Sequence, residues 1–312
     1  MLAASVAGDV KAARHLLASG DGTVNAALAA NGSTALLFAS QHGHVELARF
    51  LIEEGANVNA ATTDGGVAAL MLASEGGHLG MAQLLVEKGA SVNAASLDVG
   101  WTALMLASAH GHLEVVRLLV ATDAIFINAA TKDNGFTALM WACYYSRKDV
   151  AQALAEEGAD VNAASLDVGW TSLMQASEDG QLEIAQLLVE RGANVNATRT
   201  DDGGTALMCA SEGGHLRVVQ LLVGAGASVH AKRTTDFSTA AMIAFEMGTG
   251  LGTSAFKGGG GEDTGDPLSP RHMEIVRFLT RSSLPAERAK VKAREDVEAR
   301  EEVEEVDVGS WW

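Results

Sequence analysis

Cysteine and proline are scarce in this chain of 312 residues, which contains two cysteines and three prolines. The cysteines, Cys143 and Cys209, are too few for a disulfide framework. The N-terminal stretch MLAASVAGDVKAARHLLASG lacks the basic region, apolar core and cleavage site of a secretory leader, and no apolar run approaches the roughly 20 residues that cross a bilayer. We therefore expect an intracellular, cytoplasmic protein with no membrane partner, and the nucleus is the alternative location.

Positive charge and aromatic residues are also scarce. The chain carries 22 Lys and Arg against 39 Asp and Glu, for a net charge of −17. Such a surface repels a phosphate backbone on average, which argues against nucleic acid as a partner. The hydrophobic fraction is 48% but the aromatic fraction only 5%, which indicates a core of Ala, Leu and Val between closely packed short helices.

An internal repeat determines the organisation of the chain. One phrase recurs at a spacing of 34 or 35 residues, as STALLFAS (33–40), VAALMLAS (67–74), WTALMLAS (101–108), FTALMWAC (136–143), WTSLMQAS (170–177), GTALMCAS (204–211) and STAAMIAF (238–245). A second apolar stretch follows most copies, as in GHVELARFLIEEGANVN (43–59). Each unit therefore predicts two short helices joined by a tight turn.

Residue types mark the helix ends. The threonine of the phrase is suited to cap the first helix through its hydroxyl. Glycine favours the left-handed backbone that ends helices, and it recurs after the first helix at Gly43, Gly77, Gly111, Gly180 and Gly214, and after the second at Gly55, Gly89, Gly158, Gly192 and Gly226. The histidines after the first set of turns are expected to form hydrogen bonds within those turns: His44, His78, His112 and His215.

The T-A-L-M, G-H, L-L and G-A-x-V-N-A series resembles the ankyrin repeat over residues 1–282. The resemblance implies an all-α ankyrin-repeat solenoid of about eight helix-turn-helix repeats, with β-hairpin-like fingers and a curved, right-handed stack. T-A-L-M stands where the family has T-P-L-H, and fingers such as NAASLDVGWT (93–102) are one residue longer than usual. We expect apolar packing of the recurring methionine to compensate, at Met71, Met105, Met140, Met174 and Met208.

The repeats and the composition divide the chain into segments. We expect an ankyrin-repeat domain at 1–282 and a charged, acidic tail at 283–312. The domain begins with a shortened capping repeat at 1–29, continues with regular repeats at about 30–234 and ends with a last repeat at 235–282. The last repeat contains a Gly-rich insertion at 247–270, which we expect to be mobile. The tail contains Trp311 and Trp312. Two interpretations of this pair stay open: a linear ligand for another domain, or a segment that folds back over the last repeat.

Candidate partner-binding residues follow from the resemblance, because ankyrin partners usually contact the finger tips and the exposed ends of the first helices. Trp101, Phe136 and Trp170 occupy the same finger position in three successive repeats and would form an aromatic ridge. The alternative is that each ring only packs against the adjacent finger. The exposed ends of the first helices add His110, Tyr144, Tyr145, Glu178, Asp179 and Glu212.

Together these residues predict a protein partner with apolar anchors and flanking Lys or Arg, because aromatic rings take the anchors and carboxylates steer the cations. The predicted function is a scaffold or adaptor that binds through the concave face and finger tips. The alternatives are a regulatory inhibitor that blocks a partner enzyme, or a subunit of an enzyme with chemistry outside the repeats. A monomer without enzymatic activity or small-molecule substrate is expected.

Metal, cofactor and catalytic sites have weaker support. His42 and His110 lie two repeats apart, so no single ion bridges them. The cysteines occupy apolar helix positions, and the glycine runs at 248–254 and 257–262 lack the context of a phosphate loop. We therefore predict no catalytic residue, cofactor or metal.

Two kinds of covalent modification stay open. Ser269 precedes a proline and is a candidate for phosphorylation. The finger asparagines match a family position that is sometimes hydroxylated, although a structural role accounts for them without it: Asn59, Asn93, Asn128, Asn162 and Asn196.

Overall fold

The computed structural model describes residues 1–20, 22–249 and 269–283. Contacts within the chain divide it into two units, Met1–Leu166 and Asp167–Trp312. Most of the Gly-rich insertion, at 250–268, and nearly all of the charged tail, at 284–312, lie outside the described residues.

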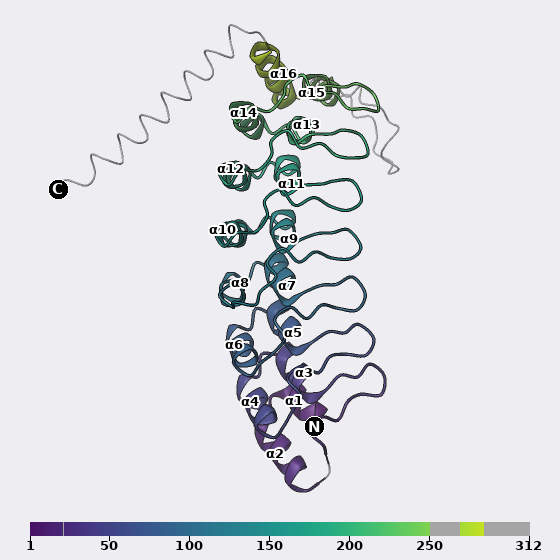
Figure 1. The fold of residues 1–312 in the computed structure, drawn as a ribbon, viewed down its shortest axis with the longest axis vertical. Helices are drawn as coiled ribbons and strands as arrows, with labels where there is room; N and C mark the ends of the chain where they lie inside the picture. The colour runs from purple at the N-terminus through teal and green to yellow at the C-terminus, as the bar shows by residue number, and fades with distance from the viewer. Residues whose placement is uncertain (21, 250–268, 284–312) are drawn as a thin grey trace, which may run out of the picture. The chain divides into compact units, whose positions relative to one another are not determined.

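Unit 1 is a stack of five helix pairs. In chain order they are α1 (Leu2–Ala7) and α2 (Val10–Ala18), α3 (Ala35–Gln41) and α4 (Val45–Glu53), α5 (Ala69–Glu75) and α6 (Leu79–Glu87), α7 (Ala103–His110) and α8 (Leu113–Val120), α9 (Ala138–Tyr144) and α10 (Lys148–Glu156). The odd-numbered helices pack in one row and the even-numbered helices in a second, with the fingers projecting on the odd-numbered side (Figure 1).

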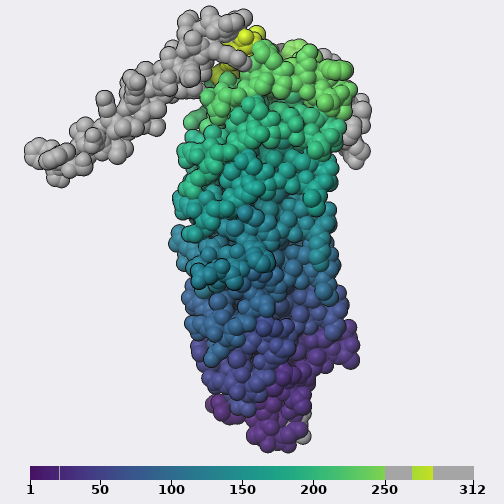
Figure 2. Space-filling view, in the orientation of Figure 1, coloured from purple at the N-terminus to yellow at the C-terminus, as the bar shows by residue number. Residues whose placement is uncertain are grey.

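Unit 2 repeats the same arrangement. Its helices are α11 (Ser172–Glu178), α12 (Leu182–Glu190), α13 (Ala206–Glu212), α14 (Leu216–Gly224), α15 (Ala240–Thr249) and α16 (Pro270–Ser282). Within each unit the colour in Figure 2 changes in chain order, as expected when each repeat packs on its sequence neighbours. No helix among the described residues has the length and apolar character needed to cross a membrane.

Threonine caps start most of the odd-numbered helices, as the sequence predicts. The hydroxyl oxygen of Thr102 accepts a hydrogen bond from the backbone N–H of Met105 at 3.3 Å, and α3, α9, α11 and α13 begin in the same way. Such a cap contributes about 1 kcal/mol. Ala68 holds this position before α5 and forms no side-chain cap.

The recurring histidines correct one expectation, because they form hydrogen bonds across repeats rather than within their own turns. In unit 1 the Nε2 atom of His112 lies 2.9 Å from the carbonyl oxygen of Glu75, in the preceding repeat, and in unit 2 His215 lies 2.8 Å from that of Glu178. The turn glycine makes room for the ring: a Cβ on Gly77 would lie 2.5 Å from His112, and its φ of 68° is left-handed. These imidazoles therefore tie neighbouring repeats together.

The repeat formed by α9 and α10 has Ser146 and Arg147 where the turns before α4, α6, α8 and α14 have glycine and histidine, and it keeps the bond to the preceding repeat. Ser146 takes the left-handed turn conformation, at a φ of 55°, in place of glycine. Arg147 replaces the histidine, and its Nε–H donates to the carbonyl oxygen of Ala109 at 3.1 Å. The sequence change therefore preserves the geometry of the stack.

The finger asparagines also join repeats. The amide of Asn59 donates to the carbonyl oxygen of Gly89 at 3.2 Å, while its oxygen accepts from the backbone N–H of Ser91 at 2.8 Å. In unit 2, Asn196 bonds to Gly226 and Ser228 in the same way. A structural role for these asparagines is thus confirmed.

The core consists of small and aliphatic side chains between the two rows of each unit. All five recurring methionines are buried: Met71, Met105 and Met140 in unit 1, Met174 and Met208 in unit 2. Isolated antiparallel bridges at the finger bases, such as Ala95 with Thr102, are the only strand-like pairing among the described residues. The predicted all-α solenoid with hairpin-like fingers is confirmed.

Candidate partner-binding surface

Five aromatic side chains gather on the odd-numbered side of unit 1. Trp101 and Phe136 end two successive fingers, directly before the threonines that cap α7 and α9, while Trp141 and Tyr144 lie on α9 and Tyr145 is its C-cap. We call these five residues the aromatic cluster.

Trp141 is the centre of the aromatic cluster. Its ring centroid lies 4.5 Å from that of Trp101 and 5.0 Å from that of Phe136. Tyr144 meets it edge-on at 5.9 Å, and Tyr145 stacks on it at 6.0 Å. Aromatic pairs at such separations contribute about 0.5–1.5 kcal/mol each beyond their buried area. The structure thus brings Trp101 and Phe136 together through Trp141, which is not among the predicted contact residues.

The fingers fix the two outer rings. The Trp101 N–H donates to the Ser96 hydroxyl at 3.0 Å, and its carbonyl oxygen accepts from the Ser96 N–H at 2.9 Å. Phe136 and Thr131 form the equivalent pair at 2.9 Å and 3.0 Å. Trp101 and Phe136 are half-buried, so they pack against neighbouring rings and still reach the surface.

The tyrosines are the exposed part of the aromatic cluster. Tyr144 and Tyr145 are 48% and 45% exposed. The Nε1 atom of Trp141 is buried beneath the surface and has no hydrogen-bond partner within the described residues. Exposed aromatic area of this kind is typical of a surface that binds a partner.

His110 lies at the end of α7 and is exposed, as predicted. Its Nδ1 atom lies 3.0 Å from the carbonyl oxygen of Leu106, and its ring stacks on that of His112 at 6.0 Å. Its described contacts are therefore with its own repeat and not with the aromatic cluster.

In unit 2, Trp170 is part of a polar network. Its Nε1–H donates to the side-chain oxygen of Gln175 at 3.0 Å, and Gln175 in turn donates to the Asp179 carboxylate at 2.8 Å. Gln181 donates to the same carboxylate at 2.9 Å. The guanidinium carbon of Arg199 lies 5.1 Å from the Trp170 ring centroid. Trp170 and Asp179, both predicted contact residues, are therefore held by partners within unit 2.

Three acidic residues of unit 2 form ion pairs with arginines: Asp201, Asp202 and Glu212. The Glu212 carboxylate accepts from Arg233 at 2.9 Å. A hydrogen bond from Arg199 lowers the pKa of Asp201, and the same bond raises the pKa of Arg199. Glu178 is exposed, and its backbone carbonyl receives the inter-repeat bond from histidine described above. The expected acidic surface is present, but part of its charge is neutralised within the chain.

Neither cysteine forms a disulfide bond within the described residues, and both are buried. Burial, followed by the charge of nearby Glu178, raises the pKa of Cys209 to about 12. A nucleophilic cysteine needs an accessible thiolate, so Cys209 is unsuited to that role.

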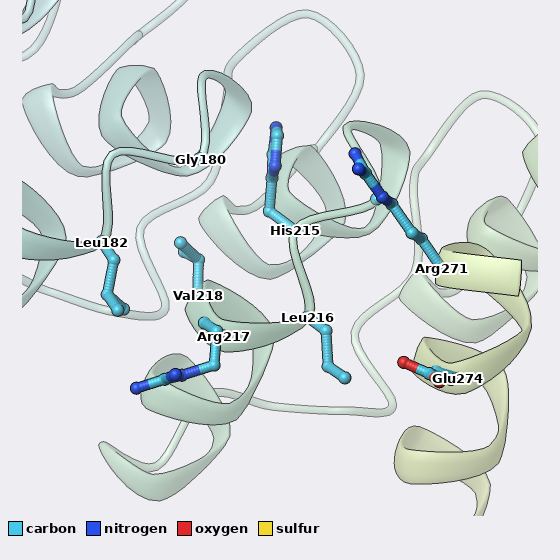
Figure 3. A pocket seen from close by; sticks show the side chains of 9 residues that line it. Gly180, Leu182, His215, Leu216, Arg217, Val218, Arg271 and Glu274 are labelled. Atoms are coloured by element: carbon cyan, nitrogen blue, oxygen red, sulfur yellow. The ribbon is translucent and has the colours of Figure 1, made fainter.

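A shallow pocket of about 360 Å³ lies where α12, α14 and α16 begin. Figure 3 shows Leu182, Leu216 and Arg271 among its lining side chains. Its lining residues include no pair of acid and base with a nucleophile, and His215 is engaged in its inter-repeat bond. Among the described residues, no group of three or more His, Cys, Asp or Glu side chains is arranged to hold a metal ion.

Comparisons with known proteins agree with this architecture. A family model described as ankyrin repeats, in three copies, matches residues 1–96, 95–165 and 163–233. The human ASB11 ankyrin repeat domain has a TM-score of 0.61 at 29% identity, covering 72% of this chain and 96% of that domain. The ankyrin repeat domain of Bcl-3, a member of the IkappaB protein family, has a TM-score of 0.62 at 28% identity, covering 79% and 99%. No curated protein matches the sequence.

Proposed function

Because the chain belongs to the ankyrin-repeat family, whose domains are protein–protein interaction modules, we propose that the aromatic cluster of unit 1 is the centre of a surface that binds a partner protein. The observation that carries the proposal is the exposure of Tyr144 and Tyr145 above Trp141. Tryptophan and tyrosine dominate the energetically important positions of protein interfaces. The two tyrosines are therefore the proposed first contacts.

The partner segment is expected to carry apolar side chains that pack on the rings. The net charge of −17 favours a segment with flanking Lys or Arg, since the field of the whole chain speeds the approach of cations. The Glu212 carboxylate contributes less to this field than the sequence suggests, because the guanidinium of Arg233 offsets its charge. Apolar contact is thus the proposed source of affinity, and charge the proposed source of a fast association rate.

Site-specific photo-crosslinking identifies the partner. A photoreactive phenylalanine analogue is placed at Tyr145 in the full chain, and at Phe126 as a matched control, because Phe126 is an exposed aromatic residue outside the aromatic cluster. The proposal predicts a protein that crosslinks from position 145 and not from position 126. Equal crosslinking from both positions, or none from position 145, would contradict it.

The same experiment separates the two forms of the function. A scaffold or adaptor is expected to yield several partners from position 145, whereas a regulatory inhibitor is expected to yield one. If the single partner is an enzyme, addition of the purified chain should lower its activity in proportion to occupancy.

A further inference from the structure

The last repeat leaves apolar side chains uncovered on the side where a further repeat would pack. Met242 holds the place in α15 that Met174 and Met208 hold in α11 and α13, yet it is 49% exposed while Met208 is 1% exposed. Phe245 is 46% exposed at the place of buried Ser211. We call Met242 and Phe245 the open end.

A stack of repeats needs a polar outer face on its terminal repeat. The open end instead presents a phenylalanine and a methionine, which are larger and more apolar than the serine that fills the Phe245 place inside the stack. Such a patch is typical of a surface that another segment covers. We therefore expect another segment to cover the open end.

The neighbouring helix α16 has a distinctive charge. Aligning His272 with His215 and Gln181 places Arg277 where α12 and α14 have glutamine, and Arg281 where they have Glu190 and Gly224. Both arginines are exposed. Neither forms an ion pair with any residue that the structure describes. The last helix is thus suited to an acidic occupant.

We propose that residues 284–312 of this chain cover the open end. The acidic run of this segment, from Glu295 to Asp307, complements the charge of Arg277 and Arg281. Its Trp311 and Trp312 supply apolar side chains that can cover Met242 and Phe245. A buried tryptophan contributes about 150–250 Å² of contact surface. The segment thereby acts as the outer cap of the solenoid.

Covalent connection and charge favour this occupant. The segment follows Ser283 at the end of α16, which packs directly on α15. Its 29 residues (284 to 312, counted inclusively) reach at most about 3.3–3.6 Å each when extended, far more than the roughly 8–10 Å between packed helices. A second copy of the chain would bring another net charge of −17 to the same surface, which opposes association.

Photo-crosslinking from the open end tests the proposal. Phe245 is replaced in the full chain by p-benzoyl-L-phenylalanine, which keeps an aromatic ring at that position. The expected product is an intramolecular crosslink to a peptide within residues 303–312, read by mass spectrometry. A crosslinked dimer, a crosslink to residues 250–268, or no crosslink would each overturn the proposal.

Amide hydrogen exchange of α15 provides an independent test, in which Met242 and Phe245 keep their native side chains. Trp311→Ala/Trp312→Ala is expected to speed amide exchange in residues 240–249 at least tenfold, as truncation after Ser283 should, while the matched control Val291→Ala/Val297→Ala leaves it unchanged. Arg277→Glu/Arg281→Glu is expected to speed it in the same direction. Identical exchange in the wild type, the tryptophan variant and the truncation would overturn the proposal, whatever the outcome for the partner surface of unit 1.

Discussion

The odd-numbered sides of the two units have the same backbone plan but different surfaces. In unit 1, Trp141 gathers four other rings around it and leaves two tyrosines exposed. In unit 2, the equivalent place is Gln175 in one repeat and Cys209 in the next, and Trp170 is tied into hydrogen bonds with Gln175. At this helix position Trp141 builds an aromatic surface, whereas Gln175 builds a polar, hydrogen-bonded one.

This difference shows how a repeat scaffold separates stability from recognition. The caps, the inter-repeat histidine bonds and the buried methionines recur in both units. Changes at the surface positions between them alter what the face can bind without altering the fold, because each repeat contacts only its neighbours.

Removing the central ring should have the largest effect on stability. Trp141→Ala is expected to lower the free energy of unfolding by about 2–4 kcal/mol, because four ring contacts and a large buried area are lost. Gln175→Ala, the matched change in unit 2, is expected to cost about 1 kcal/mol through its hydrogen bonds. Urea denaturation measures both, and equal losses would remove the contrast between the units.

The Cys209 thiol, at the position in unit 2 that is equivalent to Trp141, tests whether solvent reaches that side of the unit. Cys209 in the folded chain is expected to react with iodoacetamide at pH 8 at least about 100-fold more slowly than in the unfolded chain, since burial and a raised pKa suppress the thiolate. Alkylation at the rate of the unfolded chain would show that the Cys209 thiol is accessible to solvent.

The same pKa shift predicts a dependence of stability on pH. Because the folded-state pKa of Cys209 lies above its ordinary value of 9.0, its contribution to stability is complete below pH 9.0 and is lost as the pH rises to about 12. Cys209→Ala should reduce the loss of stability over this range, and an unchanged pH profile would contradict the assignment.

The framework shared by the units predicts equal effects. His112→Ala in unit 1 and His215→Ala in unit 2 are each expected to lower stability by about 1–2 kcal/mol, because each leaves a carbonyl oxygen of the preceding repeat without its bond. His42→Ala serves as control, since its bond stays within its own helix. A large difference between the two units would mean that their frameworks are not equivalent.

The ion pairs of unit 2 should have the smallest effect. Glu212→Gln is expected to change the free energy of unfolding by less than about 1 kcal/mol, because exposed pairs contribute little. It should also leave partner affinity within about twofold, since a paired carboxylate steers weakly. A tenfold loss of affinity would assign Glu212 to the contact surface after all.

The repeat architecture could be predicted from the sequence because its signals are local and recur. A threonine, a glycine and an apolar spacing each act within one helix or turn, so the phrase beginning at Thr102 predicts the start of α7. The connections between repeats could not be assigned in this way, since the partner of His112 is a backbone carbonyl 37 residues away.

The candidate site was predicted only in part, for a related reason. Trp101, Phe136 and the tyrosines were selected from their finger and helix-end positions, but their contacts depend on Trp141, which lies within the repeating phrase itself. The two preceding repeats have leucine at the equivalent position, Leu72 and Leu106. The change from leucine to tryptophan was the sequence signal that could have identified Trp141. The pairing of Glu212 with Arg233 joins residues from different segments, which spacing does not reveal.

The affinity for the partner identified by crosslinking from position 145 shows whether the aromatic cluster is the contact surface. Its dissociation constant is measured by calorimetry for the wild type, Tyr144→Ala/Tyr145→Ala and Trp170→Ala. We expect the double tyrosine variant to lose affinity about 30-fold, which corresponds to about 2 kcal/mol, and Trp170→Ala to lose less than about threefold. An unchanged affinity for the tyrosine variant, or a larger loss for Trp170→Ala, would contradict the proposed contact surface.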